Sequence, residues 1–349
     1  MLGMTPITWY KIRKLLKYGL VTSSVAWVLT LFSGEAVWQV LGAWFLLGIW
    51  TGVLEEFLFG RRFRSLALPL QFVAKVMAVN LLTLALLMVA FILGRKDQLP
   101  MVGTAEVSAL ELVLMPQLYR LILRVVVVTS IAILVVQMEE FMGRRMFFGF
   151  LLGHYEKPVA EERILLSIDL VGSTALNEKL GDLQYFRFLN TTHSLMTDAV
   201  LRNEAEIFKY IGDEVIFTWP MRKGLRQSNA LDLYFDIAAR IKAHESDLLL
   251  EYGVVPRYRA ALHGGRVISA QVGHIKRTVD LSGDVMNSVS RMLGLAKTMK
   301  VDLLVSAELL ARVPQAADRF TIGPQHIVPV KGRRREVRVH EVVRKGLEP

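Results

Sequence analysis

Long runs of hydrophobic residues fill the first 140 positions, and the pattern changes near residue 150. Four of these runs are long enough for a helix that crosses a bilayer, which takes about 20 residues. They cover residues 18–34, 38–60, 66–94 and 117–137. From residue 161 onward, short apolar runs alternate with charged stretches and glycines, a pattern typical of a water-soluble α+β domain.

The chain therefore divides into an all-α transmembrane four-helix domain (1–137), a coupling helix and linker (138–160), and a soluble domain (161–345). Met, Phe and Leu side chains form a stripe along residues 138–155. This stripe fits a helix lying on the membrane or on the soluble domain. It equally fits a parallel two-helix linker that passes dimer geometry to the soluble domain.

Composition excludes several classes. With 53% hydrophobic and 21% charged residues, the chain is not intrinsically disordered. It has no cysteine, which excludes a disulfide scaffold, a zinc–thiolate site and a cysteine nucleophile. A net charge of +10 in so apolar a chain is typical of membrane proteins with basic cytoplasmic loops.

Basic residues precede the first run, separate the second from the third, and follow the fourth. Cytoplasmic loops carry such clusters, so both termini are expected in the cytoplasm, with the chain a multi-pass protein of a bacterial-type inner (plasma) membrane. Arg95 and Lys96 are the exception. A cleaved signal peptide is the competing interpretation of the first run, but no small-residue cleavage site follows it.

Five ionisable residues fall within or beside these runs: Glu55, Glu56, Lys75, Arg120 and Arg124. In one interpretation, their side chains reach the lipid headgroups or form ion pairs within the bundle. In the other, they form a sensing or ion-binding site, because charge inside a membrane is costly and is kept where it has a function. The two glutamates and Lys75 are expected at the same depth, where they could pair.

In the soluble part, the apolar pattern predicts a mostly antiparallel sheet in a two-layer α+β domain. Strands are expected at 163–170, 206–211, 215–219, 257–263, 267–272, 302–305, 325–330 and 336–343, and helices at 175–200, 225–252 and 283–300. Gly264-Gly265 is expected to separate two of the strands.

Two aspartates end or join these strands. Asp169 closes the first strand, and Asp213 lies in the turn of the hairpin that follows. Such carboxylates can converge on Mg²⁺, which takes one or two of them plus substrate phosphates. Taken singly, each also suits a cap or a turn.

The aspartates belong to a longer ordered series. The series is Asp169 with Gly172-Ser173-Thr174, Lys209 with Gly212-Asp213, Asp280, Asn287-x-x-x-Arg291 and Lys331-Gly332. It resembles the catalytic domain of class III nucleotidyl cyclases over about residues 161–343. The resemblance implies a ferredoxin-like, palm-type βαββαβ sheet and adenylyl cyclase activity, which converts ATP to 3′,5′-cyclic AMP and pyrophosphate. Gly212-Asp213-Glu214 alone is also similar to the signature of diguanylate cyclases.

The resemblance assigns the metal and purine contacts. Asp169 and Asp213 match the ligands of two Mg²⁺ (or Mn²⁺) ions per active site, with Ile168 or neighbouring backbone beside them. Lys209 and Asp280 match the residues that contact the purine. An ammonium can donate to adenine N1 and a carboxylate can accept from the 6-amino group, whereas guanine presents the opposite pattern, so ATP is favoured.

The remaining roles concern the sugar and the phosphates. Asn287 matches the ribose-orienting residue, Arg291 the arginine near the α-phosphate, and Arg259 a further family arginine. Lys331 matches the lysine near the terminal phosphates, although its Lys-Gly-Arg-Arg-Arg context also suits a basic loop. Asn287 and Arg291 are four residues apart and hence share one helix face.

In the family that the chain resembles, one catalytic domain supplies the metal aspartates and a second supplies the purine, ribose and phosphate contacts. A homodimer is therefore implied. The expected partners are ATP, the lipid bilayer and an unknown membrane ligand or regulatory protein, with no nucleic acid. Two alternatives remain: a guanylyl or diguanylate cyclase, and a membrane receptor or transporter with an inactive nucleotide-binding domain.

Overall fold

The computed structural model describes residues 5–31, 37–59, 67–94, 116–275, 277–313, 316–328 and 336–346. The chain forms two compact units, Met1–Phe148 and Gly149–Pro349. The unit boundary lies within the predicted linker. Each unit has its own hydrophobic core.

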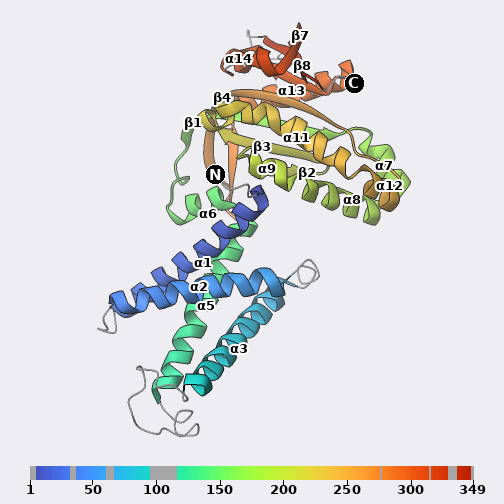
Figure 1. Ribbon diagram of the computed structural model, residues 1–349. Helices are drawn as coiled ribbons and strands as arrows, with labels where there is room; N and C mark the ends of the chain where they lie inside the picture. Colours follow the sequence, from blue (N-terminus) through green and yellow to red (C-terminus); the bar gives the residue numbers. More distant parts are fainter. Residues whose placement is uncertain are drawn as a thin grey trace. The chain divides into compact units, whose positions relative to one another are not determined.

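The first unit is a bundle of long helices (Figure 1). They are α1 (Pro6–Leu31), α2 (Val37–Leu58), α3 (Leu68–Gly94) and α5 (Pro116–Met142). Three of them match the predicted runs closely, but α1 begins well before residue 18 and includes the lysines that precede the first run. Small residues let α1 and α2 approach closely: a Cβ on Gly48 would lie 2.5 Å from the Tyr18 carbonyl oxygen, as is common between membrane helices.

Two helices among the described residues are long and apolar enough to cross a membrane, over Leu41–Leu58 and Tyr119–Met142. A shorter apolar helical stretch covers Pro69–Ala85. The prediction of four spans is thus supported for two helices by length and composition, and it stays a prediction for the others.

Three of the predicted ionisable residues of this unit, Glu55, Glu56 and Lys75, form ion pairs. Lys75 Nζ lies 2.6 Å from Glu55 Oε1, as predicted, and Tyr18 donates a hydrogen bond to the same carboxylate. Glu56 instead pairs with Lys11 at 2.9 Å. The predicted pairing of Lys75 with a glutamate of the second run is therefore confirmed for Glu55. Arg120 lies exposed near the start of α5.

The linker is not one continuous helix. Gly143 has a left-handed φ of 82°, which ends α5 and separates it from α6 (Arg144–Leu151). Within the second unit, the Tyr155 ring packs on Gly149 so closely that a Cβ there would lie 2.2 Å from it. The stripe along 138–155 therefore belongs to two helices and a turn.

The second unit is built on one eight-stranded sheet (Figure 1) with the order β2-β3-β1-β4-β6-β8-β7, and with β5 paired to β4. The strands are β1 (Val159–Leu170), β2 (Glu206–Ile211), β3 (Glu214–Pro220), β4 (Tyr258–Val272), β5 (Thr278–Ser282), β6 (Leu303–Ser306), β7 (Phe320–Val328) and β8 (Val337–Arg344). All neighbours are antiparallel except β4 and β6. The predicted mostly antiparallel sheet is confirmed.

Helices cover both faces of this sheet, so the prediction of two layers was wrong. One face packs on α7 (Ser173–Leu180), α8 (Asp182–Leu195), α9 (Thr197–Arg202), α11 (Asn229–Ala243) and α12 (Glu245–Tyr252), and the other face packs on α13 (Asp284–Met299). Short helices α10 (Met221–Leu225), η2 (Arg226–Ser228), α14 (Ala307–Leu310) and α15 (Ala316–Arg319) complete the unit. Because both faces of the sheet are covered, β1 is buried at every residue from Arg163 to Ile168 and shows no alternation of buried and exposed residues.

One strand prediction was wrong. Gly264-Gly265 does not turn the chain, and β4 pairs with β1 without interruption from Tyr258 to Ser269. The glycine at 264 serves packing, because a Cβ there would lie 3.0 Å from Leu309 and 3.1 Å from Met221 side chains. A glycine pair in a strand thus marks a close approach of other side chains.

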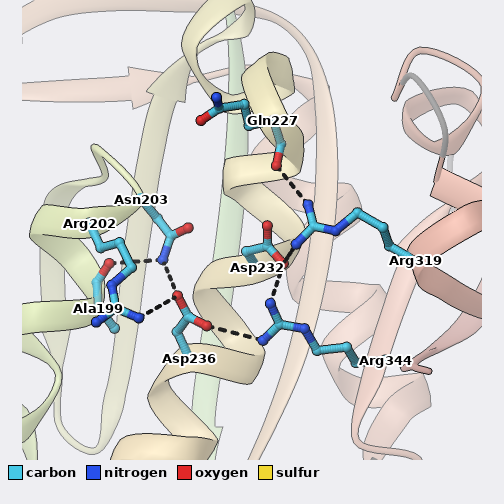
Figure 2. A network of polar contacts seen from close by, with 8 residues as sticks. All are labelled: Ala199, Arg202, Asn203, Gln227, Asp232, Asp236, Arg319 and Arg344. Carbon is cyan, nitrogen blue, oxygen red and sulfur yellow. Dashed lines mark hydrogen bonds and ion pairs between the residues drawn. The ribbon is translucent and has the colours of Figure 1, made fainter. Parts of the chain in front are cut away.

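An ionic network connects α15 and β8 to α11 (Figure 2). Asp232 accepts from Arg319 at 2.8 Å and from Arg344 at 3.1 Å, and Arg344 also reaches Asp236 at 3.1 Å. Asn203 donates to Asp236 at 3.0 Å. Burial raises the pKa of Asp232, although Arg319 and Arg344 act in the opposite direction. Desolvation of this carboxylate therefore offsets part of the stability that its ion pairs contribute.

Replacing Arg344 with methionine should lower the free energy of unfolding by about 1–3 kcal/mol, because two carboxylates of α11 lose a shared partner. Arg338→Met is the matched control, since it removes an exposed arginine from the same strand. Urea unfolding of the full chain in detergent measures both. Equal midpoints for the two variants would show that the network adds no stability.

Candidate active site

The two predicted metal aspartates lie at the same end of neighbouring strands. Asp169 is the penultimate residue of β1, and Asp213 lies in the turn between β2 and β3 beside Gly212, whose φ is 64°. β1 and β3 are paired, with Ile168 opposite Val215. Burial raises the pKa of Tyr185, and the negative charges of Asp213 and Asp169 raise it further. Both carboxylates therefore lie close enough to the Tyr185 hydroxyl to affect its ionisation. The structure therefore brings these two residues together.

The carboxylates suit a divalent cation. Asp213 Oδ2 is buried and has no hydrogen-bond partner among the described residues, although a buried carboxylate oxygen is costly without one. The described residues contain no group of three or more His, Cys, Asp or Glu side chains able to hold a metal. Two carboxylates are enough for Mg²⁺, which completes its shell with water and phosphate oxygens. Ile168 is fully buried beside them, between Val215 and Ala260.

The predicted purine-contacting residues form an ion pair. Lys209 Nζ of β2 lies 3.5 Å from Asp280 Oδ1 of β5. Their side chains are 47% and 40% exposed, so both remain open to a ligand. A bulge between Ile207 and Lys209 shifts the register of β2 at this point. β5, which no pattern in the sequence predicted, is the strand that brings Asp280 to Lys209.

Helix α13 carries the ribose and phosphate candidates. Its apolar side chains Val289, Met292 and Ala296 are buried against the sheet. Asn287 is exposed on the other side of the helix, and Arg291, one turn later, is half-buried. Their shared face was predicted from their spacing and is confirmed by the helix.

Arg259 lies on β4 directly opposite Asp169. Its Nε is buried and has no hydrogen-bond partner within the part of the chain that the structure describes, which fits a group kept for an anionic ligand. Lys331 lies outside the described residues, in the segment between β7 and β8.

A lysine that sequence reasoning missed contacts one of the two predicted metal aspartates. Lys297, in the last turn of α13, places Nζ 2.6 Å from Asp169 Oδ2. A lysine at a helix C-terminus ordinarily interacts with the helix dipole, so nothing in the sequence distinguished it.

A family model, described as the adenylate and guanylate cyclase catalytic domain, matches residues 156–343, which is more than half of the chain. The chain belongs to this family. It carries a class III nucleotidyl cyclase catalytic domain, as the ordered motifs predicted.

Cyclases from several sources are similar to this chain. It is 40% identical over 181 residues to Adenylate cyclase 2 of Rhizobium meliloti (strain 1021), a match that covers 52% of this chain and 50% of that one. It is 26% identical over 188 residues to an adenylate cyclase of Anabaena cylindrica, covering 51% and 36%. The chain thus matches half or less of the length of these curated relatives.

The cyclase fold also agrees with a solved structure. A bacterial light-regulated adenylyl cyclase is 22% identical, with a TM-score of 0.52, over 66% of this chain and 65% of that chain. At this identity the likeness supports the α+β sheet fold.

The cyclase sheet contains a pH-sensitive histidine. His263 of β4 is 5% exposed, and its Nδ1 lies 2.8 Å from Ser306 Oγ. Burial lowers the pKa of His263 below its usual value near 6.5. His263 therefore binds a proton less readily in the folded protein than in the unfolded chain. The free energy of unfolding falls as the pH drops below about 6.5.

We expect the Tm of the full chain to fall between pH 7.5 and pH 5.5, and His263→Gln to flatten part of this slope. Burial also lowers the pKa of His193, so some slope remains. His274→Gln changes an exposed histidine and should leave the slope intact. Equal slopes for His263→Gln and His274→Gln would contradict the assignment.

Proposed function

We propose that the protein is a membrane-bound adenylyl cyclase that converts ATP to 3′,5′-cyclic AMP and pyrophosphate. The observation that carries this proposal is the pairing of Lys209 with Asp280 at 3.5 Å, in a domain that also keeps Asp169 and Asp213 together. An ammonium and a carboxylate side by side match adenine N1 and the 6-amino group, and they oppose the pattern of guanine. The similarity to Adenylate cyclase 2 of Rhizobium meliloti supports the same substrate.

The active site is proposed to be shared between two copies of the chain. Lys297 contacts Asp169 of its own chain, and Asn287 lies ten residues earlier on α13, about 15 Å along the helix. Asn287 also faces away from its own sheet. We propose that it serves the aspartates of a second copy, while the second copy's Asn287 serves the aspartates of this chain.

The surface of the cyclase domain suits such a partner. Tyr210 and Ile211 are half exposed on β2, and Ile275 is fully exposed in the turn between β4 and β5. These apolar side chains flank Lys209 and Asp280 in the chain. Exposed apolar side chains lose contact with water when a second copy covers them. Such side chains therefore favour a dimer at a site to which one chain is proposed to supply only part of the residues.

Each side chain would then have a distinct task. Lys209 and Asp280 select the adenine, and Asn287 orients the ribose so that its 3′-hydroxyl faces the α-phosphorus. Arg291 and Arg259 stabilise negative charge on the phosphoryl oxygens as pyrophosphate leaves, and Lys331 binds the outgoing phosphates. Asp169 and Asp213, beside Ile168, would hold two Mg²⁺ or Mn²⁺ ions, which when bound neutralise phosphate charge and acidify the 3′-hydroxyl.

The membrane location belongs to the same proposal. Two long apolar helices and the basic clusters support a multi-pass membrane domain over 1–137 with both termini in the cytoplasm. Residues 138–160 would couple it to the catalytic domain over 161–345. A membrane ligand or regulatory protein that acts through this domain is part of the proposal.

A direct assay tests the activity. The full chain, purified in detergent, is given ATP and then GTP with Mg²⁺ or Mn²⁺, and the products are separated. We expect cyclic AMP from ATP. A preference for GTP would support the guanylyl cyclase alternative, and no cyclic nucleotide under any of these conditions would support an inactive nucleotide-binding domain.

A further inference from the structure

The contact between Lys297 and Asp169 distinguishes the two aspartates of the proposed metal site. Asp169 Oδ2 lies 2.6 Å from the Lys297 ammonium, whereas Asp213 Oδ2 has no hydrogen-bond partner in the described ranges. Asp169 is 12% exposed and Lys297 51% exposed. The carboxylate is therefore fixed in the protein, and the ammonium reaches it from the surface.

The helix holds Lys297 in this position. Met292 and Ala296 have no exposed surface, and Leu293 is 5% exposed, so the last turns of α13 cannot slide along the sheet without opening the core. Only the side-chain torsions of Lys297 are free to move. The contact can therefore break and re-form while the helix remains in place.

An ammonium at this point opposes a divalent cation in two ways. It occupies a carboxylate oxygen that a cation would use, and its charge repels the cation at short range. We propose that Lys297 is a positioning residue that holds Asp169 in the metal-free protein and competes with the divalent cation for this carboxylate. The inference rests on the proposed metal site at Asp169 and Asp213.

Removing the lysine side chain should leave the fold intact. Lys297 is half exposed, and Arg259, directly opposite Asp169 on β4, remains to offset the carboxylate. A pair with one exposed partner is worth about 1 kcal/mol, which corresponds to about a five-fold change in an equilibrium constant. Loss of Lys297 should therefore increase cation affinity by about that factor.

The test measures metal binding without nucleotide or turnover. Free Mn²⁺ is titrated by electron paramagnetic resonance against the full chain in detergent. We expect Lys297→Gln to bind Mn²⁺ about five-fold more tightly than the wild type, and Lys297→Arg to bind it about as the wild type does. Lys300→Gln, which removes an exposed charge directly after the same helix, should change the affinity by less than about two-fold.

A further variant separates the inference from the proposed function. Asp213→Ala should abolish this Mn²⁺ binding. If Asp213→Ala lowers the affinity but Lys297→Gln binds as the wild type does or more weakly, the competition is overturned while the metal site stands. If Mn²⁺ binding is unchanged in Asp213→Ala, the metal site is overturned, and the inference with it.

Discussion

Replacing Asp213 with alanine should reduce the formation of cyclic AMP by at least about 10³-fold, because phosphoryl transfer then loses a carboxylate that would hold a divalent cation. The fold should tolerate this change. Asp213 Oδ2 has no hydrogen-bond partner in the described part of the chain, so its removal breaks no such bond of that atom and relieves a desolvation cost. The Tm should therefore be equal to or above that of the wild type.

The measurement compares initial rates of cyclic AMP formation at saturating ATP and Mn²⁺. Asp247→Ala serves as the matched control, because it removes an exposed carboxylate from α12 on the same domain. Its rate should stay within about two-fold of the wild type. Turnover in Asp213→Ala near that of the control would contradict the role of this turn.

Exchanging the charges of the purine pair should move the preference from ATP toward GTP. In Lys209→Glu/Asp280→Lys an acceptor faces the N1–H of guanine and a donor faces its O6, while the exchanged charges can still pair across 3.5 Å. We expect the ratio of kcat/KM for ATP to that for GTP to fall by about 10²-fold or more, since each mismatched polar contact costs about 1–3 kcal/mol.

The single variants are the controls for this exchange. Lys209→Glu alone places two carboxylates together, and Asp280→Lys alone places two ammonium groups together, so both should lose activity with either nucleotide. The double variant should recover GTP turnover relative to both. An unchanged nucleotide preference in the double variant would show that this pair does not read the base.

The sequence was informative where spacing fixes geometry. The hairpin around Gly212-Asp213 and the helix that carries Asn287 and Arg291 were both predictable, because turn residues and a four-residue separation act locally. The family resemblance then placed Lys209 and Asp280 in one site, although 70 residues separate them. The structure brings them within 3.5 Å of each other.

The features that were missed depend on tertiary packing. β5 has only five residues and is a strand because it pairs with β4. Gly264 was predicted to lie in a turn, but it lies within β4, where the side chains of Leu309 and Met221 leave little room for a Cβ. Lys297 acquires its role only when α13 lies on the sheet. The local pattern of hydrophobic and polar residues predicts none of these three features.

We expect two copies of this chain to make cyclic AMP at a shared site, and complementation between two inactive variants measures this sharing. Asp213→Ala removes a proposed metal carboxylate and Arg291→Ala removes the arginine proposed to stabilise the phosphoryl charge, so each chain alone should be inactive. In a dimer of one copy of each, one site receives the intact aspartates from one chain and the intact arginine from the other. With equal co-expression, half of the dimers are mixed and each has one working site of two, so purified protein should recover about a quarter of wild-type turnover. No recovery in mixed dimers that have been shown to form would contradict the shared site.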